Sequence, residues 1–362
     1  MASQPAGSWE EAIKVTPTSS HTYSANLRLE WSIGIVPNGG YITAIFYNVA
    51  RTHMRTTHPK LHNGSPDPIT VHLTFLRRTE PGPATFRVQD TKLGSRTSTL
   101  HITLSQTDAD GGVRDEVAGY ITVSNIATEE GPSITTRYAL VPPPPPGADG
   151  SRRVDLAKLA REGRDGEWAP FAVPLSSMRR ATKHIEFFIP TAEENAKRGF
   201  VEQWVRFRPY GKLRKWDDAA LGFLIDMFPM ILETFDERPW DKPDDASSGS
   251  TASAATAAQQ AEKKKKEAMT PEQKAASVLK FWYPTVLLNV EFKKKLPPGG
   301  SEWLYSRVIT KALKNGRMDL DIVVLDEHGD VVALSNHVAL IVSAERNLAA
   351  RKGNGKKSGA KI

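Results

Sequence analysis

Residues 68–124 read PITVHLTFLRRTEPGPATFRVQDTKLGSRTSTLHITLSQTDADGGVRDEVAGYITVS and carry a strong secondary-structure pattern. It contains four runs rich in Val, Ile, Thr and Phe, and Pro-Gly and Asp-Gly turn signals separate these runs. Alternation of apolar and polar residues is typical of half-buried strands, because successive side chains point to opposite faces. The stretch therefore predicts a four-stranded antiparallel meander.

A second copy of this pattern occupies residues 284–343, which read PTVLLNVEFKKKLPPGGSEWLYSRVITKALKNGRMDLDIVVLDEHGDVVALSNHVALIVS. The corresponding positions are Phe75, Pro81, Gly82, Leu100, Ile102, Val117 and Ala118 in the first copy and Phe292, Pro298, Gly299, Leu320, Ile322, Val332 and Ala333 in the second. Self-similarity of this kind indicates an internal duplication. We therefore expect two related halves.

A mainly apolar helix is expected before each meander. The first is GGYITAIFYNVARTHM at residues 39–54, where Asn38 can cap the helix and Gly39 and Gly40 allow a tight turn and close backbone approach. The second is ALGFLIDMFPMILETF at residues 220–235, which follows two aspartates. Helices that are apolar on nearly every side are buried. The pattern predicts an α+β fold of the tandem (double) hotdog type, with two antiparallel sheets that each wrap one long helix.

The two halves are expected to fold as one unit. Each meander alone would leave an exposed strand edge, which soluble proteins avoid. The two helices should therefore lie side by side, and the two sheets should be joined at an edge.

Two breaks divide the chain. LVPPPPPGADG at residues 140–150 contains five consecutive prolines, which favour an extended and semi-rigid spacer. Residues 241–275 are too poor in large apolar side chains to bury a core, so they predict a disordered low-complexity insertion. The expected domains are an N-terminal hotdog (1–140), a Pro-rich linker (141–150), a C-terminal hotdog that carries the insertion (151–345) and a basic tail (346–362).

Composition limits the classes of function. The 362 residues include no cysteine, which excludes disulfides, a thiol nucleophile and thiolate metal sites. No segment approaches the ~18 uncharged apolar residues of a membrane span. The net charge of +7 is concentrated in low-complexity pieces without interleaved aromatic residues, so a nucleic-acid partner is not expected. No metal or cofactor motif is recognisable, and neither is expected. Homo-oligomerisation stays open.

One carboxylate, Asp226, lies within the apolar run from Leu221 to Leu232. Burial of an anion costs several kcal/mol unless the anion is paired or hydrogen-bonded, so a stretch that only filled a core would carry Leu or Met there. Because lone buried acids cluster at functional sites, the sequence predicts a catalytic role for Asp226. The structural alternative is an acid that binds an inner backbone group or pairs with Arg206 or Arg208.

The motif PNGGYITA at residues 37–44, the order of helix and strands, the duplication and the lone Asp together resemble the double-hotdog acyl-CoA thioesterases of the type II thioesterase-like superfamily. The resemblance covers both halves and leaves out the linker, the insertion and the tail. In that family an Asp of the second-half helix, a Thr at the start of the following strand and a Gln on the last strand activate a water. The resemblance places Asp226 and Thr285 at the first two positions, and His337, with Asn336 beside it, at the Gln position. A histidine there can orient water or act as a base itself.

Two further features concern the predicted chemistry. Thioester hydrolysis needs donors for the developing oxyanion, and backbone amides at a helix start are suited to this. Gly39 and Gly40 are therefore candidate oxyanion and substrate-binding residues. Pro229 cannot donate to the carbonyl of Ile225, so it is expected to bend the second helix near Asp226.

Three functions are compatible with these residues. The first is an acyl-CoA thioesterase that hydrolyses a fatty or related acyl thioester to free acid and CoA. The second is a non-catalytic acyl-binding or scaffold hotdog protein, which an ion-paired Asp226 would favour. The third is a hotdog hydratase or dehydratase, which would need both Asp226 and His337 on one substrate.

The C-terminal residues Ala360, Lys361 and Ile362 resemble a peroxisomal signal, since they have the small, basic and aliphatic order of Ser-Lys-Leu. The sequence therefore predicts a peroxisomal or a cytoplasmic location.

Overall fold

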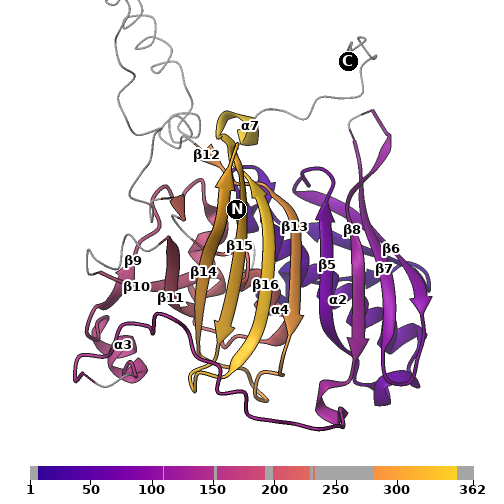
Figure 1. The fold of residues 1–362 in the computed structure, drawn as a ribbon. Coiled ribbons are helices and arrows are strands. Elements are labelled where there is room, and N and C mark those ends of the chain that lie inside the picture. The colour runs from indigo at the N-terminus through magenta and orange to yellow at the C-terminus, as the bar shows by residue number, and fades with distance from the viewer. Residues whose placement is uncertain are drawn as a thin grey trace, which may run out of the picture.

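Thirteen strands form one continuous antiparallel sheet in a computed structural model that describes residues 7–108, 110–150, 153–191, 199–228, 231–232 and 281–348 (Figure 1). The N-terminal half contributes β1 (Thr16–Pro17), β2 (Thr22–Leu27), β6 (Gly82–Lys92), β7 (Ser98–Thr107), β8 (Val113–Ser124) and β5 (Asp67–Phe75), in spatial order. The C-terminal half continues the sheet with β13 (Thr285–Phe292), β16 (Val331–Leu340), β15 (Arg317–Leu325), β14 (Trp303–Lys314), β11 (Phe200–Phe207), β10 (Ile185–Pro190) and β9 (Trp168–Phe171).

The two halves join where β5 pairs with β13. This pairing is antiparallel, and Val71 lies opposite Val290. The edge contact that the sequence predicts is therefore present, but the prediction of two sheets is wrong in one respect, because the pairing makes a single sheet. Hydrogen bonding across the join satisfies two strand edges that would otherwise be open.

The strand order supports the internal duplication. Outward from the join, β5, β8, β7, β6 and β2 on one side correspond to β13, β16, β15, β14 and β11 on the other. Leu100 and Ile102 on β7 are fully buried, as are their counterparts Leu320 and Ile322 on β15. The two meanders predicted from the sequence therefore occupy equivalent places in the two halves of the sheet.

The first predicted helix is present as α2 (Gly39–Thr57). It is buried along most of its length, and Asn38 caps its start by accepting a hydrogen bond from the amide of Tyr41. It lies against β5 and β8 and beside α4 (Asp218–Leu224), behind the sheet in Figure 1. The side-by-side packing of the two helices agrees with the sequence prediction.

The second predicted helix is much shorter than expected. It ends at Leu224, and Asp226 lies in the turn that follows, outside the helix. Proline lacks the N–H that would bond to the carbonyl four residues earlier, and it disfavours helical backbone at the residue before it. Pro229 therefore accounts for the early end. Its own placement lies outside the described residues.

The helices α2 and α4 approach each other through glycine. A β-carbon added at Gly40 would lie 2.5 Å from the carbonyl oxygen of Phe223 and 2.9 Å from the β-carbon of Asp226. One at Gly222 would lie 3.2 Å from the amide nitrogen of Ala44. Because only glycine fits such a close contact without a shift, Gly40 sets the distance between α2 and the turn that carries Asp226. The close backbone approach predicted for this glycine is therefore present.

The proline-rich segment packs on the C-terminal half. The carbonyl of Pro142 accepts a hydrogen bond from Arg307, at 2.6 Å, and the carbonyl of Pro145 accepts one from the indole of Trp168, at 3.1 Å. This segment is therefore held by side chains of the second half. The bounds of the four expected segments stay a prediction.

The remaining elements are short. The helices are α1 (Trp9–Ala12), α3 (Leu156–Glu162) and α7 (Glu345–Leu348), and two small ladders pair β3 (Ser32–Ile33) with β4 (Val36–Pro37) and β12 (Phe281–Trp282) with β17 (Val342–Ser343). Within the described ranges, no helix has the length and apolar character needed to cross a bilayer. The predicted insertion at 241–275 and the C-terminal tripeptide lie outside these ranges, so the insertion and the peroxisomal signal stay predictions.

Candidate active site

A cavity of about 320 Å³ opens where the two halves meet. Its wall combines the start of α2, the end of β5, the turn after α4, the start of β13 and the end of β16. Most of the lining is apolar and includes Ile33, Val36, Phe75, Val173, Met178, Phe187, Met227, Phe228, Ile231, Phe281, Trp282, Tyr283, Val286 and Leu340. The polar and charged lining side chains include Asn38, Asp226, Thr285, Arg77, Arg78 and Arg179.

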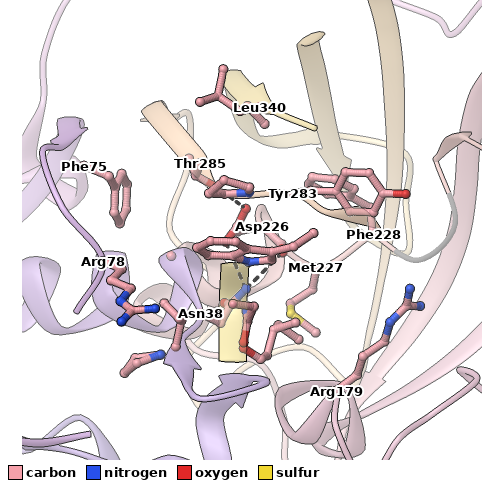
Figure 2. A pocket seen from close by; sticks show the side chains of 18 of the residues that line it. Asn38, Phe75, Arg78, Arg179, Asp226, Met227, Phe228, Tyr283, Thr285 and Leu340 are labelled. Atoms are coloured by element: carbon pink, nitrogen blue, oxygen red, sulfur yellow. Dashed lines mark hydrogen bonds between the residues drawn. The ribbon is translucent and has the colours of Figure 1, made fainter. Parts of the chain in front are cut away.

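Asp226 lies at the centre of this wall, and its side chain is 8% exposed (Figure 2). Its Oδ2 accepts hydrogen bonds from the side-chain amide of Asn38, at 2.9 Å, and from the backbone amide of Gly40, at 3.0 Å. Its Oδ1 accepts a hydrogen bond from the hydroxyl of Thr285, at 3.2 Å. The structure therefore brings together Asp226 and Thr285, which the sequence predicts as partners.

The start of α2 is built to hold this anion. Asn38 accepts from the amide of Tyr41 with its Oδ1 and donates with its Nδ2 to both the carboxylate and the backbone carbonyl of Asp226. The N-terminal end of a helix carries a partial positive charge and unpaired N–H groups, which favour a nearby carboxylate. The sequence shows Asn38 only as a cap, because its second contact depends on a residue of the other half.

The surroundings of Asp226 favour its protonated form more than water does. Burial is the main cause and raises the pKa of Asp226 to about 6, although the donors Gly40, Thr285, Gly39 and Asn38 partly oppose it. A carboxyl group that titrates near this value can exchange protons close to neutral pH.

Two structural roles were open for Asp226. The ion pair with Arg206 or Arg208 is wrong, and the binding of an inner backbone group is present in part. Arg206 pairs with Glu186 and Glu302, and Arg208 pairs with Glu186, so neither arginine neutralises Asp226. The carboxylate does bind an inner backbone amide, as the capping alternative predicts. Asp226 also lies in the cavity wall, where a small molecule can reach it, and a purely structural acid would not need this access.

His337 lies beside Asp226 but does not form an ion pair with it. The two are 3.7 Å apart, measured from Nδ1 to Oδ1, and the imidazole is fully buried on β16. Burial lowers the pKa of His337 to about 3, so the ring is neutral wherever Asp226 is ionised. Neither ring nitrogen has a hydrogen-bond partner among the described residues, and the cavity lining does not include this side chain.

Asn336 is not part of the arrangement. Adjacent residues of a strand point to opposite faces, and His337 takes the inner face while Asn336 is exposed. The side-chain amide of Asn336 donates to Asp321 on the neighbouring strand, at 2.9 Å. Asn336, which the resemblance places beside the family Gln position, therefore makes no hydrogen bond to Asp226.

The two glycines serve a different acceptor from the one predicted. The amide of Gly40 donates to the Asp226 carboxylate, and the amide of Gly39 also acts to lower the pKa of this acid. The sequence predicts a substrate oxyanion as their acceptor. In this structure the start of the helix instead stabilises the anionic form of Asp226, because an anion within the protein already occupies its donors.

The arginines of the cavity were not predicted from the sequence. Arg77 and Arg78 follow Leu76 after the end of β5, and Arg179 comes from the C-terminal half. Figure 2 shows Arg78 and Arg179 on opposite sides of Asp226. The adjacent Arg-Arg pair after a strand was a usable signal for an anion-binding group, whereas nothing in the sequence connects that pair with Arg179.

Comparisons with known proteins find similarity over both halves of the chain. Residues 142–341 match a family model described as the acyl-CoA thioesterase C-terminal domain, and residues 27–124 match one described as the N-terminal domain. The chain is similar to the thioesterase-like protein TwmA of Talaromyces wortmannii, with 33% identity over 376 residues, which cover 99% of this chain and 100% of TwmA.

Solved structures support the fold. One is a conserved protein of unknown function with a hot dog fold from Alicyclobacillus acidocaldarius, with a TM-score of 0.60 and 15% identity, where the match covers 92% of this chain and 97% of that one. Another is the acyl-CoA thioesterase II TesB2 of Mycobacterium marinum, with a TM-score of 0.53 and 13% identity over 92% of this chain and 98% of that one.

Proposed function

The chain belongs to the acyl-CoA thioesterase family and is a thioester hydrolase, and we propose that it hydrolyses acyl-CoA by means of a water that Asp226 activates. The observation that carries this proposal is the carboxylate of Asp226 in the cavity wall, held by Asn38, Gly40 and Thr285. These donors fix the carboxylate in one orientation while leaving it in contact with the cavity.

In the proposed reaction, Asp226 takes a proton from the water as the water oxygen attacks the thioester carbonyl. The carbon–sulfur bond of the tetrahedral intermediate then breaks, and the proton passes from Asp226 to the leaving CoA sulfur. The products are a free carboxylic acid and CoA. This role needs a carboxylate whose pKa lies close to the working pH, which the burial of Asp226 supports.

Thr285 and His337 are proposed to position the water. Thr285 already bonds Oδ1, the oxygen of Asp226 that lies nearer to His337. A buried neutral imidazole needs a hydrogen-bond partner, and a water between Nδ1 and Asp226 would supply one. His337 would then act as the Gln of the family does, and its low pKa argues against a role as the base.

The cavity also supports the substrate class. Its mainly apolar wall suits an acyl chain, since burial of each methylene contributes about 0.8 kcal/mol. Arg77, Arg78 and Arg179 suit the phosphates of CoA, because guanidinium groups bind phosphate through paired N–H donors. The chain length of the acyl group is not specified by these contacts.

The two alternative functions receive less support. A scaffold protein would be favoured by an ion-paired Asp226, and this acid instead lines a cavity and receives neutral donors. A hydratase or dehydratase would need His337 on the substrate, and His337 is not among the residues that line the cavity.

Release of free CoA thiol from a series of acyl-CoAs, from acetyl to stearoyl, tests the proposed substrate. We expect the purified chain to release thiol from at least one member of the series and the Asp226→Asn variant to lack most of that activity. Equal thiol release by the two proteins would remove Asp226 from the mechanism. An inactive wild-type protein across the whole series would contradict acyl-CoA as the substrate class.

The activity should depend on pH through Asp226. The base must be ionised, and burial raises the pKa of this acid to about 6, so kcat/KM should be constant above that value. Below it, kcat/KM should fall about tenfold per pH unit as Asp226 becomes protonated. Initial rates measured from about pH 5 to about pH 8 check this. A profile without a transition between about pH 5 and pH 7 would contradict the assignment of Asp226 as the base.

A further inference from the structure

Three histidines converge on one aspartate at the far end of α2. The Nε2 atoms of His53 and His58 each lie 2.8 Å from a carboxylate oxygen of Asp90, and the Nε2 of His21 lies 3.1 Å away. The four ligand atoms all lie within 4.8 Å of one another. His21 directly precedes β2, His53 lies on α2, His58 follows the end of α2, and Asp90 lies on β6.

These distances fit a tetrahedral site. Zinc binds imidazole nitrogen at about 2.0–2.1 Å and carboxylate oxygen at about 2.0–2.2 Å, so neighbouring ligand atoms in a zinc tetrahedron lie about 3.3 Å apart. The nitrogen–oxygen distances of 2.8 to 3.1 Å are a few tenths of an ångström shorter than this value. All four ligand atoms lie within 4.8 Å of one another, so the side chains would draw together by up to about 1.5 Å at the widest pairs to bind the ion.

The surroundings also match those of metal ligands. Histidines that bind a metal usually hydrogen-bond an oxygen through the other ring nitrogen, which fixes the ring. The Nδ1 of His53 lies 3.0 Å from the hydroxyl of Tyr23, and the Nδ1 of His21 lies 2.9 Å from the hydroxyl of Ser20. His53 is fully buried, whereas the side chain of His21 is 44% exposed, which leaves a route for an ion to enter.

We propose that His21, His53, His58 and Asp90 form a binding site for one divalent transition-metal ion, most suitably zinc. Three imidazoles and one carboxylate are ligands that zinc accepts, and four protein ligands complete its tetrahedral shell. The site is structural, because a closed shell leaves no position for substrate. It joins the end of α2 to β6 and to the start of β2.

The proposed metal site is separate from the candidate active site. Gly40 contacts Asp226 at the start of α2, and His53 lies near the other end of the same helix. At 1.5 Å per residue, the helix places these two residues about 20 Å apart. The ion would therefore fix the helix whose first turn holds Asp226, without a direct part in hydrolysis.

Zinc binding by the full-length, tag-free chain tests this inference. After dialysis against EDTA and then metal-free buffer, titration calorimetry with zinc should give one site per chain, and metal analysis after gel filtration should find one retained zinc. Cobalt(II) should give the intense visible absorption of a tetrahedral site. Zinc should also raise the unfolding temperature, because an ion that binds the folded state stabilises it.

Variants separate the site from adventitious binding. His58→Gln and Asp90→Asn each remove one ligand and should weaken zinc binding about a hundredfold or more, and Tyr23→Phe, which removes a partner of His53, should weaken it about 10- to 100-fold. His328→Gln, an exposed histidine in the turn between β15 and β16, is the matched control and should bind zinc like wild type. If Asp90→Asn does not fold, the partly exposed His21→Gln replaces it.

Two results would overturn the proposal. The first is a wild-type chain that retains no zinc and shows no calorimetric site, since the cluster would then be only a hydrogen-bonded network around Asp90. The second is zinc binding of wild-type strength in His58→Gln and His21→Gln, because the metal would then bind elsewhere.

Discussion

Replacement of Asp226 by Asn should reduce kcat for thioester hydrolysis on the order of 10²- to 10⁴-fold, which is the usual contribution of a general base. The amide oxygen of Asn can accept from Asn38 and Gly40 in place of Oδ2, and its NH₂ can donate to the hydroxyl of Thr285 in place of Oδ1. The variant therefore keeps the hydrogen bonds but cannot take a proton from water. Steady-state kinetics with the best acyl-CoA of the series measure the loss.

The same variant should fold at least as well as wild type. Because the folded pKa of Asp226, about 6, lies above its ordinary value of 3.8, this group stabilises the fold fully below the ordinary value, and the stabilisation is lost as pH rises through about 6. At pH 7 the wild type therefore carries a buried anion that Asn does not. Urea unfolding at pH 7 should show an equal or higher midpoint for Asp226→Asn, with KM nearly unchanged.

Two neighbouring variants serve as comparisons. Thr285→Val removes one donor and leaves the base, so its loss of kcat should be smaller than that of Asp226→Asn. His337→Gln introduces the residue that the family carries and should retain activity if His337 only orients water. A large loss in His337→Gln would make the histidine the base. An Asp226→Asn variant that hydrolyses at the wild-type rate would remove Asp226 from the mechanism.

The fold was largely predictable because its pattern is local and occurs twice. The alternating runs in residues 68–124 and 284–343 each specify a meander, and the correspondence of Leu100 with Leu320 shows the duplication. The continuity of the sheet depends on which edges meet, which alternation within a strand does not encode. The apolar run favours a helix as far as residue 235, but the helix ends at Leu224, because Pro229 removes a helical hydrogen bond.

The candidate site was predictable where the sequence shows an anomaly and hidden where it depends on tertiary contact. Asp226 is conspicuous in an apolar run, and the family resemblance leads from it to Thr285. The second contact of Asn38 joins opposite halves of the chain and has no local signature. Asn336 and His337 are adjacent polar residues, and the sequence does not show which of them points to the core. The structure shows that His337 does and that Asn336 is exposed.

The histidine cluster shows the same limit more strongly. Its ligands come from the residue before β2, from α2 and its end, and from β6, so the cluster has no spacing that a metal motif would match. The sequence predicts no metal site for this reason. Only the packing of α2 against the sheet places these side chains around one carboxylate.

The candidate active site requires that the two halves keep a fixed distance. Asp226 comes from the C-terminal half, and its hydrogen-bond donors come from both halves. The halves come into close backbone contact at Gly40, where an added β-carbon would meet the carbonyl oxygen of Phe223 at 2.5 Å. Backbone atoms cannot rotate away as a flexible side chain can, so α2 or α4, with the turn that follows it, must move. The geometry of Asp226 therefore depends on a glycine that performs no chemistry.

Gly40→Ala should consequently lower kcat/KM about a hundredfold, since a displacement of about 1 Å at a catalytic group has an effect of this size. It should also cost about 1–3 kcal/mol of stability through overpacking, although Ala favours helix over Gly by up to about 1 kcal/mol. Kinetics and urea unfolding measure the two effects. Gly112→Ala is the matched control, because its added β-carbon meets only the side chain of Asp108, at 3.1 Å. Wild-type activity in Gly40→Ala would show that the close approach of the two helices does not position Asp226, and the carboxylate would then be held by Asn38 and Thr285 alone.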